Sequence, residues 1–168
     1  MNKGFTIIEL TVVTSIIVIV TAFLVTDFSR SKIDLNEAAL TSLDAVREAQ
    51  TDAQSGIIFK GKYRCGYGIH FDTTSYTIYA GPDAKSVNCL VQDRNYNPGV
   101  DEVVRQETLK NIKLTYTPSV DVFFEPPNPT TYLGGSSAAG VSTLIPICLN
   151  GTDCQKIYVS TSGQNELQ

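Results

Sequence analysis

The first 25 residues constrain the fold of this chain more than any other stretch. After a short leader that carries one basic residue, Lys3, an apolar run extends from Phe5 to Val25. Beyond Glu9 this run contains no charged residue, proline or glycine. A helix of about 21 residues is roughly 31 Å long, which matches the hydrocarbon core of a bilayer. The sequence therefore predicts a membrane-spanning helix at the N-terminus.

Two ordinary explanations of such a run fit less well. A secretory signal peptide has a shorter apolar core followed by a small-residue cleavage site, and residues 26–32 (TDFSRSK) offer no such site. A plain membrane anchor fits the length but leaves Glu9 unexplained. A charged group inside the bilayer costs about 2.5 to 3.5 kcal/mol even on the lenient insertion scale. The acid near the start of the span needs a reason of its own.

The segment GFTIIEL, residues 4–10, resembles the processing motif of type IV pilins and type II secretion pseudopilins. The resemblance implies that a prepilin peptidase cleaves after Gly4 and that the new terminal Phe5 is N-methylated. It also implies that Glu9 pairs with the terminal amine of a neighbouring subunit, because a buried charge is tolerated only with a partner. The alternative is that Glu9 lies among lipid headgroups, since it is only about one helical turn from Phe5.

Composition indicates a single modest domain beyond the helix. The chain has 168 residues, a net charge of −4 and only 18% charged residues. Thr, Ser, Tyr, Gly and Asn are plentiful, as in extracellular β-rich domains. No basic patch stands out, so nucleic acid is not an expected partner.

A single helix is allowed from Phe5 to Ser55, because this stretch contains neither proline nor glycine. We divide the chain into a leader (1–4), a transmembrane or filament-core half of the helix (5–28), an amphipathic half (29–55) and a β-rich extracellular domain (56–168). Gly56 is the expected C-cap. One face of the second half carries apolar residues at helical spacing, namely Leu35, Ala39, Leu43, Val46, Ala49 and Ala53.

The pattern after Gly56 alternates with a period of two, which predicts antiparallel strands. A hairpin is expected over 63–79 and a loop over 84–100. Further strands are expected at 57–59, 103–109, 112–117, 120–124, 144–148 and 155–160. The fold class is therefore α+β, with a long N-terminal helix packed on an antiparallel β-rich domain, in a pilin-like arrangement.

Three segments of the globular part are similar to H-type minor pseudopilins and FimT-like minor pilins: AVREA (45–49), VFFEP (122–126) and KIYVSTSG (156–163). The resemblance implies a minor structural subunit without enzymatic activity. Its partners would be other pilin or pseudopilin subunits, the prepilin peptidase and the inner-membrane assembly platform. The chain would cross the cytoplasmic membrane once with its C-terminal domain outside, and then join an extracellular or periplasmic filament. Some FimT-like proteins bind DNA through a basic tail, but residues 164–168 contain no Arg or Lys.

The chain contains an even number of cysteines, Cys65, Cys89, Cys148 and Cys154. Beyond a membrane-spanning start they indicate disulfides rather than a metal site, since no pair has the Cys-x-x-Cys spacing. Cys148 and Cys154 enclose a turn between two expected strands, which favours a hairpin-closing bond and leaves Cys65 to pair with Cys89. The two other connectivities stay open.

One loop has the oxygen spacing of a calcium site. Asp93, Asn95, Asn97 and Asp101 resemble the first half of an EF-hand loop, with Gly99 offering its carbonyl. The sharp-turn glycine is replaced by Pro98, and the final ligand position is occupied by Val104. Turns use the same residue types, and an ordinary turn is the favoured interpretation. Calcium is therefore a hypothesis, and no other cofactor is expected.

Two functions of other classes compete with a filament subunit. A membrane-anchored extracellular adhesin or ligand-binding module would display a surface such as the glycine-rich segment 134–140. An anchored enzyme is disfavoured because His70, the single histidine, lies in an alternating strand. We expect it to be solvated there, without a second element directed at it. A major pilin is also a less favoured alternative.

Overall fold

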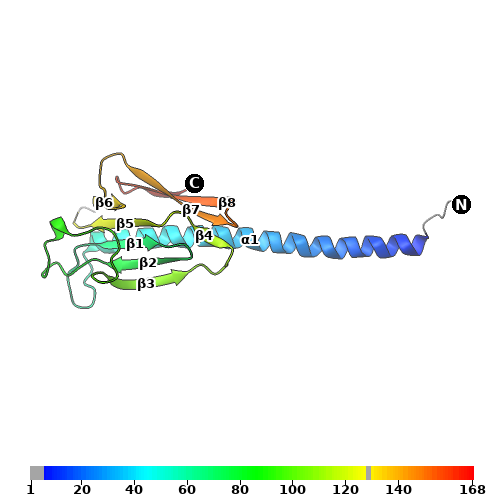
Figure 1. Cartoon of the computed structure of the whole chain (residues 1–168), viewed down its shortest axis with the longest axis horizontal. Coiled ribbons are helices and arrows are strands. Elements are labelled where there is room, and N and C mark those ends of the chain that lie inside the picture. The colour runs from blue at the N-terminus through cyan, green and yellow to red at the C-terminus, as the bar shows by residue number, and fades with distance from the viewer. Residues whose placement is uncertain (1–5, 128–129) are drawn as a thin grey trace. The chain divides into compact units, whose positions relative to one another are not determined.

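The computed structural model describes residues 6–127 and 130–168, with side chains in these ranges other than those of 26–28. It has an α+β fold, with one long helix, α1 (Ile7–Ser55), followed by antiparallel strands (Figure 1). The later elements are β1 (Tyr67–Phe71), β2 (Ser75–Ala80), the short 3-10 helix η1 (Cys89–Val91), β3 (Glu102–Thr108), β4 (Leu114–Tyr116), β5 (Val120–Glu125), β6 (Thr130–Leu133), β7 (Ser142–Leu149), β8 (Asp153–Ser160) and β9 (Asn165–Leu167).

Local sequence explains both ends of α1. The side chain of Thr6 accepts a hydrogen bond from the backbone N–H of Glu9 at 3.3 Å, which is a typical N-cap. The helix ends before Gly56, whose φ of +59° is the left-handed conformation expected of a C-cap glycine. The helix contributes to two compact units, because the chain divides after Asp34. Its second half belongs to the same unit as the strands, so the amphipathic segment and the β-rich part form one body.

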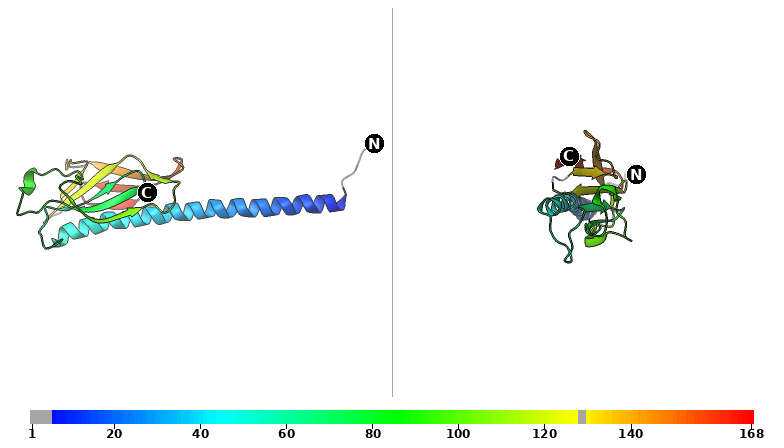
Figure 2. Two further views of the ribbon diagram at one scale, coloured as in Figure 1. Left: turned by 60° about the horizontal axis from the view of Figure 1, so that its bottom comes forward. Right: turned by 90° about the vertical axis from the view of Figure 1, so that its left-hand side faces the viewer.

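In the described residues the strands form two antiparallel sheets. The larger has five strands in the order β3-β2-β1-β5-β6, and the smaller has four in the order β4-β7-β8-β9. Residues of α1 from Leu35 onward lie along the strands in two views (Figures 1 and 2). The alternation of each strand directs one set of side chains toward this helix and the other set outward.

A single hydrophobic core lies between the second half of α1 and the two sheets. All six residues of the apolar face identified in the sequence are buried there. Both sheets contribute fully buried side chains to it, including Ile69, Ile78 and Val122 from the larger and Ile145 and Ile157 from the smaller. Ser42 interrupts the apolar face, but its hydroxyl lies 2.7 Å from the hydroxyl of Tyr116. The helix face therefore buries no unpaired hydroxyl at this point.

The structure differs from the sequence-based strands in three places. Residues 57–59 do not form a strand, because Lys60 and Gly61 adopt positive φ angles and turn the chain at once; only an isolated bridge joins Phe59 to Lys62. Strand β6 follows a proline-rich segment, and β9 lies in a polar tail, so neither has an apolar alternation that sequence analysis could detect. Both exist because a neighbouring strand pairs with them.

The small residues on the buried helix face predict an overpacking test. Ala49 is fully buried, whereas Gln54 on the same helix is exposed. We expect Ala49→Leu to lower the free energy of unfolding by about 1 to 3 kcal/mol, because the added carbons have no space. Gln54→Leu should change it by less than about 0.5 kcal/mol. Urea unfolding of the full chain in detergent micelles, followed by circular dichroism, measures both. Equal effects of the two substitutions would contradict close packing at Ala49.

Candidate functional site

The N-terminal unit presents its apolar side chains on all sides. The large hydrophobic residues between Ile7 and Val25 are exposed, and the described part of α1 is long and apolar enough to cross a membrane. Glu9 lies in the first turn, where the positive end of the helix dipole favours a carboxylate. The expected processing residues Gly4 and Phe5 lie outside the described residues.

Hydroxyl groups within this apolar segment are satisfied by the helix itself. Thr11 donates to the carbonyl of Ile8 at 2.9 Å, and Ser15 donates to that of Thr11 at 2.7 Å. Thr14 and Thr21 form the same kind of bond one turn back, at 3.0 and 2.8 Å. Such bonds remove the need for water at these side chains. The segment is therefore suited to an apolar environment despite its polar residues.

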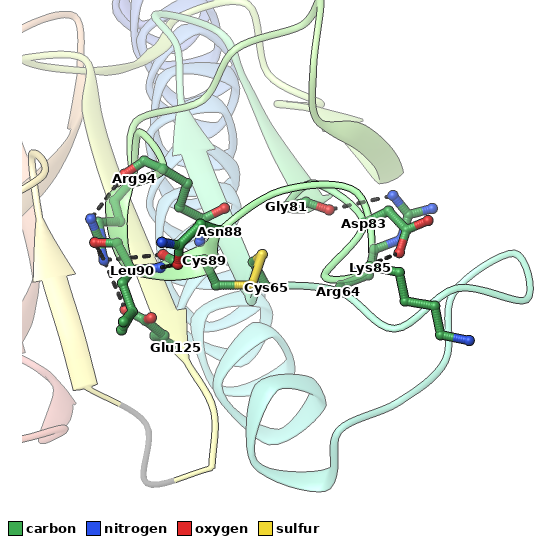
Figure 3. The surroundings of a disulfide bond; sticks show 11 residues. Arg64, Cys65, Gly81, Asp83, Lys85, Asn88, Cys89, Leu90, Arg94 and Glu125 are labelled. Carbon is green, nitrogen blue, oxygen red and sulfur yellow. Dashed lines mark hydrogen bonds and ion pairs between the residues drawn. A yellow bond between two sulfur atoms is a disulfide. The ribbon is translucent and has the colours of Figure 1, made fainter.

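In the second unit the long connection between β2 and β3 forms an ordered loop, residues 81–101, here called the anchored loop. A disulfide between Cys65 and Cys89, with 5.2 Å between their Cα atoms, attaches it to the segment before β1 (Figure 3). The carboxamide of Asn88 accepts the N–H of Leu90 at 3.1 Å and caps η1. The loop is thus fixed by a covalent bond at the place where it turns.

Arg94 stabilises the loop by contacts both within it and with the sheet. Its guanidinium donates to the carbonyl of Gln92 at 2.9 Å and pairs with Glu125 of β5 at 3.2 Å. Figure 3 shows Arg94 directed toward Glu125, on the far side of η1 from Arg64. The guanidinium also lies 4.6 Å from the ring centroid of Tyr132, a cation–π distance. One side chain therefore connects the loop to two strands.

Arg64 fixes the start of the loop in a similar way. Its side chain is 2% exposed, donates to the carbonyl of Gly81 at 3.3 Å and pairs with Glu102 at 2.7 Å. Hydrogen bonds from Arg64 and then Lys60 lower the pKa of the Glu102 carboxyl. Glu102 is the first residue of β3, so the same arginine holds both ends of the loop, by a hydrogen bond at Gly81 and an ion pair at Glu102.

An aromatic layer on the outer face of the larger sheet supports the loop. Tyr96 of the loop packs against Tyr79 and His70, with ring centroids 4.9 and 5.1 Å apart. Two glycines of the β1 region make room for this layer. A Cβ atom would come within 2.4 Å of Phe123 at Gly66 and within 2.4 Å of Tyr79 at Gly68. Any larger residue at either position would displace the rings.

The anchored loop encloses an open pocket of about 270 Å³. Its apolar wall consists of Pro82, Val87, Val91 and Val100. The polar side chains that line it are Asn88, Gln92, Asp93, Asn95, Asn97 and Asp101. All four residues of the calcium hypothesis therefore line one pocket.

Several oxygens of these four residues are already engaged within the loop. Asp93 Oδ1 accepts the backbone and side-chain N–H groups of Asn95, both at 3.0 Å. Asp101 Oδ2 accepts the N–H of Asn97 at 2.7 Å, and Asn97 Oδ1 accepts that of Gly99 at 3.0 Å. These are turn-forming bonds. In the described part of the chain no group of three acidic, histidine or cysteine side chains is placed to hold a metal ion. Calcium binding stays a prediction.

Burial in the pocket raises the pKa of the Asp101 carboxyl to about 6. The negative charges of Asp93 and Asp121 act in the same direction, while the hydrogen bond from the Asn97 N–H opposes them. An ionised Asp101 is therefore less stable here than in water, unless a positive group enters the pocket.

His70 has a partner that sequence analysis missed. Its Nδ1 lies 2.7 Å from Oδ1 of Asp121, the residue directly opposite on β5. The hydrogen bond to Asp121 raises the pKa of His70, although burial acts in the other direction. The side chain is 24% exposed, so the expected solvated histidine is instead half-buried and paired. The pairing of β1 with β5, which no local pattern encodes, brings the two residues together.

The structure joins Cys148 to Cys154, with 4.1 Å between their Cα atoms, in addition to the Cys65–Cys89 bond. The first pair closes the β7–β8 hairpin at opposed positions of the ladder. This is the connectivity that the turn between Cys148 and Cys154 favoured. The Cys65–Cys89 bond lies nearer the pocket in sequence, because Cys89 follows Asn88, which lines it.

Comparisons of the chain with models of known protein families, with curated proteins and with solved structures found no match. The function must therefore be inferred from the residues themselves.

The two disulfides should contribute unequally to stability. They close segments with sequence separations of 24 and 6 residues. We expect the double substitution Cys65→Ala and Cys89→Ala to cost about 1 kcal/mol more than Cys148→Ala and Cys154→Ala, because the longer segment gains more freedom in the unfolded chain. Urea unfolding of the full chain in detergent measures both. A larger loss for the hairpin pair would contradict the entropic account.

The raised pKa of Asp101 predicts that the wild type and an Asp101→Asn variant differ in stability in a pH-dependent way. The folded-state pKa of about 6 lies above the usual value near 4, so wild-type stability falls as pH rises through this window. Asp101→Asn keeps the acceptor for the Asn97 N–H but carries no charge. The variant should match the wild type near pH 4 and exceed it by on the order of 1 kcal/mol at pH 8, since partial exposure screens the charge.

Urea unfolding of the full chain at pH 4 and pH 8 tests this expectation. Glu166→Gln, at an exposed residue of β9, is the matched control and should show no such pH-dependent gain. A constant difference between Asp101→Asn and the wild type at both pH values would contradict an elevated pKa.

Proposed function

We propose that the chain is a structural subunit, of the minor type, of a type IV pilus or a type II secretion pseudopilus. In this proposal the precursor is cleaved after Gly4 and N-methylated at Phe5. It then assembles through the first half of α1, where Glu9 pairs with the terminal amine of a neighbour. The proposal includes no enzymatic activity and no binding of nucleic acid.

One observation carries the proposal: Glu9 stands in the first turn of a helix whose following apolar side chains, through Val25, are exposed. Exposed apolar surface of this extent requires lipid or other protein to cover it. Both environments make an unpaired carboxylate costly. A positive amine at Phe5 of a neighbouring subunit, about one helical turn away in sequence, offsets that cost and defines the stagger between subunits.

The two halves of α1 differ in how their apolar side chains are covered, which supports the proposal. From Leu35 onward its apolar face is buried by the strands, whereas Ile7 to Val25 has no such cover in its own unit. The hydroxyls of Thr11, Ser15 and Thr21 are satisfied within the helix. The first half can therefore move from lipid to a packed helical core without uncovering polar groups.

The partners and location follow from this role. The prepilin peptidase and the inner-membrane assembly platform would act on the N-terminal segment, and other pilin or pseudopilin subunits would bind it. The β-rich unit would lie outside the cytoplasmic membrane before assembly and on an extracellular or periplasmic filament afterwards. Two disulfides fit an oxidising compartment of this kind.

A second candidate function is favoured by the pocket of the anchored loop. A membrane-anchored extracellular module that binds a ligand, as an adhesin does, would need a fixed loop around a cavity that combines apolar surface with polar groups. The two functions are compatible, because a filament subunit can also display a binding site.

The N-terminal mass of native protein tests the proposed function. Protein is isolated from membranes and from sheared surface material, and its mass is measured intact and after proteolysis. A species that begins at Phe5 with one added methyl group would support prepilin processing. Its presence in sheared material would indicate a filament, and its presence in membranes alone would favour an initiating or pseudopilin subunit. An intact Met1 terminus in both fractions would contradict the proposal.

A Glu9→Gln variant extends the same experiment to assembly. It removes the charge and keeps the size, so the chain should still insert into the membrane. Co-purification of neighbouring subunits from solubilised membranes should fall by about ten-fold or more, because the amine loses its partner. Asp44→Asn, an exposed acid on the second half of α1, is the matched control and should leave co-purification unchanged. Unchanged association of the Glu9→Gln variant would remove Glu9 from the mechanism.

A further inference from the structure

The pocket of the anchored loop has the size and the walls of a site for one side chain. Its volume of about 270 Å³ lies just below the roughly 300 Å³ at which sites for larger small molecules usually begin. Pro82, Val87, Val91 and Val100 supply apolar surface. Val91 and Val100 are 78% and 55% exposed. An aliphatic stem that packed against this wall would cover them.

Charge in the pocket is negative. Asp93 and Asp101 line it, and none of its lining residues in the described part of the chain is basic. The two cations of the anchored loop are directed elsewhere: Arg94 pairs with Glu125, and Lys85 lies 5.9 Å from the ring centroid of Tyr63. In each carboxylate the hydrogen bonds within the loop go to one oxygen, Oδ1 of Asp93 and Oδ2 of Asp101.

A buried amide beside the carboxylates adds an unmet requirement. Gln92 lines the pocket, and both polar atoms of its side chain are buried without a hydrogen-bond partner among the described residues. Buried polar groups are usually paired, and leaving one unpaired costs free energy. Because neither atom is exposed to solvent, a ligand reaches this amide only if the Gln92 side chain turns into the pocket.

We propose that this pocket binds a primary ammonium group on an aliphatic stem, the chemistry of a lysine side chain, with Asp101 and Asp93 pairing with the ammonium. The apolar wall takes the methylene groups, and the carboxylates select the charge. The site does not depend on filament assembly.

A bare divalent ion uses these features less well. Calcium takes six to eight oxygen ligands, whereas Asp93, Asn97 and Asp101 each commit an oxygen to the loop. Four aliphatic residues in the wall would contribute nothing to its coordination. An ammonium group needs fewer acceptors, and its stem gains from the apolar surface.

Isothermal titration of the full chain in detergent micelles at pH 7.5 tests the proposal with four probes. Nα-acetyl-lysine amide carries the free ammonium, and Nα,Nε-diacetyl-lysine amide has the same stem without charge. The third probe is n-pentylammonium, and calcium chloride is the fourth. We expect saturable binding of the first and third probes, and none of the diacetyl compound.

Comparison of the two amines identifies the natural source of the group. Tighter binding of the lysine derivative would assign the site to a lysine side chain of a peptide or protein. Equal binding would assign it to a free alkylamine.

Substitutions of the two pocket carboxylates test whether the ligand binds in the pocket. Asp101→Asn should weaken binding of the lysine derivative by about ten-fold or more, because a charge-assisted hydrogen bond is lost. Asp93→Asn should weaken it as well. The matched control Glu166→Gln makes the same change of charge on β9, in the other sheet, and should leave affinity unchanged.

Three results would overturn the proposal. The first is absence of binding by either amine to wild-type protein that shows native circular dichroism. The second is equal binding by the diacetyl compound, which would mean that the charge is not recognised. The third is saturable calcium binding that Asp101→Asn abolishes and the amines do not displace.

Discussion

The buried face of α1 between Leu35 and Ala53 is the constraint on which the rest of the globular unit depends. Each sheet turns an apolar face toward the helix, and neither sheet is stable unless that face is covered. The same helix face covers both, and its residues include alanines that are 0% exposed, Ala39, Ala49 and Ala53. Short side chains let the strands approach the helix closely. Because the core lies on this side, the outer face of the larger sheet is free to carry a loop, and the pocket lies in that loop.

The loop that covers the outer face is held by different interactions from those of the main core. The anchored loop has few apolar side chains to bury, so it is held by a disulfide at Cys89 and by two arginines that reach opposite flanks, Arg64 and Arg94. Aromatic rings on the outer face of the sheet pack against the loop. Gly68 leaves space for one of them, the ring of Tyr79. A loop fixed by covalent and charged contacts can enclose a cavity without collapsing into it. The oxygens that resemble calcium ligands contribute to the same rigidity, since several of them form the turns of the loop.

The N-terminal unit is stabilised differently from the globular unit. Its described side chains through Val25 form no core of their own, so they acquire a stable environment only from lipid or from other chains. The hydroxyl groups of the span form hydrogen bonds within the helix, so they can lie in lipid or against protein. In the described part of the span, through Val25, Glu9 is the single charged group that needs an external partner. In the proposed filament subunit such a segment would couple membrane insertion to assembly, because the charge that is costly in lipid would be paired with a neighbour's amine. The pilin-like proposal rests on this coupling and on the motif of residues 4–10.

The sequence by itself determined the long helix, its cap at Gly56, the buried positions of its second half and most of the strands. These features follow from local periodicity and from single residues whose backbone preferences are strong. It also predicted a loop over 84–100 and singled out Asp93, Asn95, Asn97 and Asp101 by their oxygen spacing, but no sequence pattern indicated a pocket or its apolar wall. Only the tertiary structure decided that β6 and β9 are strands, that His70 faces Asp121, and that Asp93 and Asp101 meet the apolar wall formed by Pro82 and Val87. These contacts join residues that are distant in sequence or that have no distinctive local pattern, so they arise from strand pairing and loop closure, and no window of the sequence contains that information.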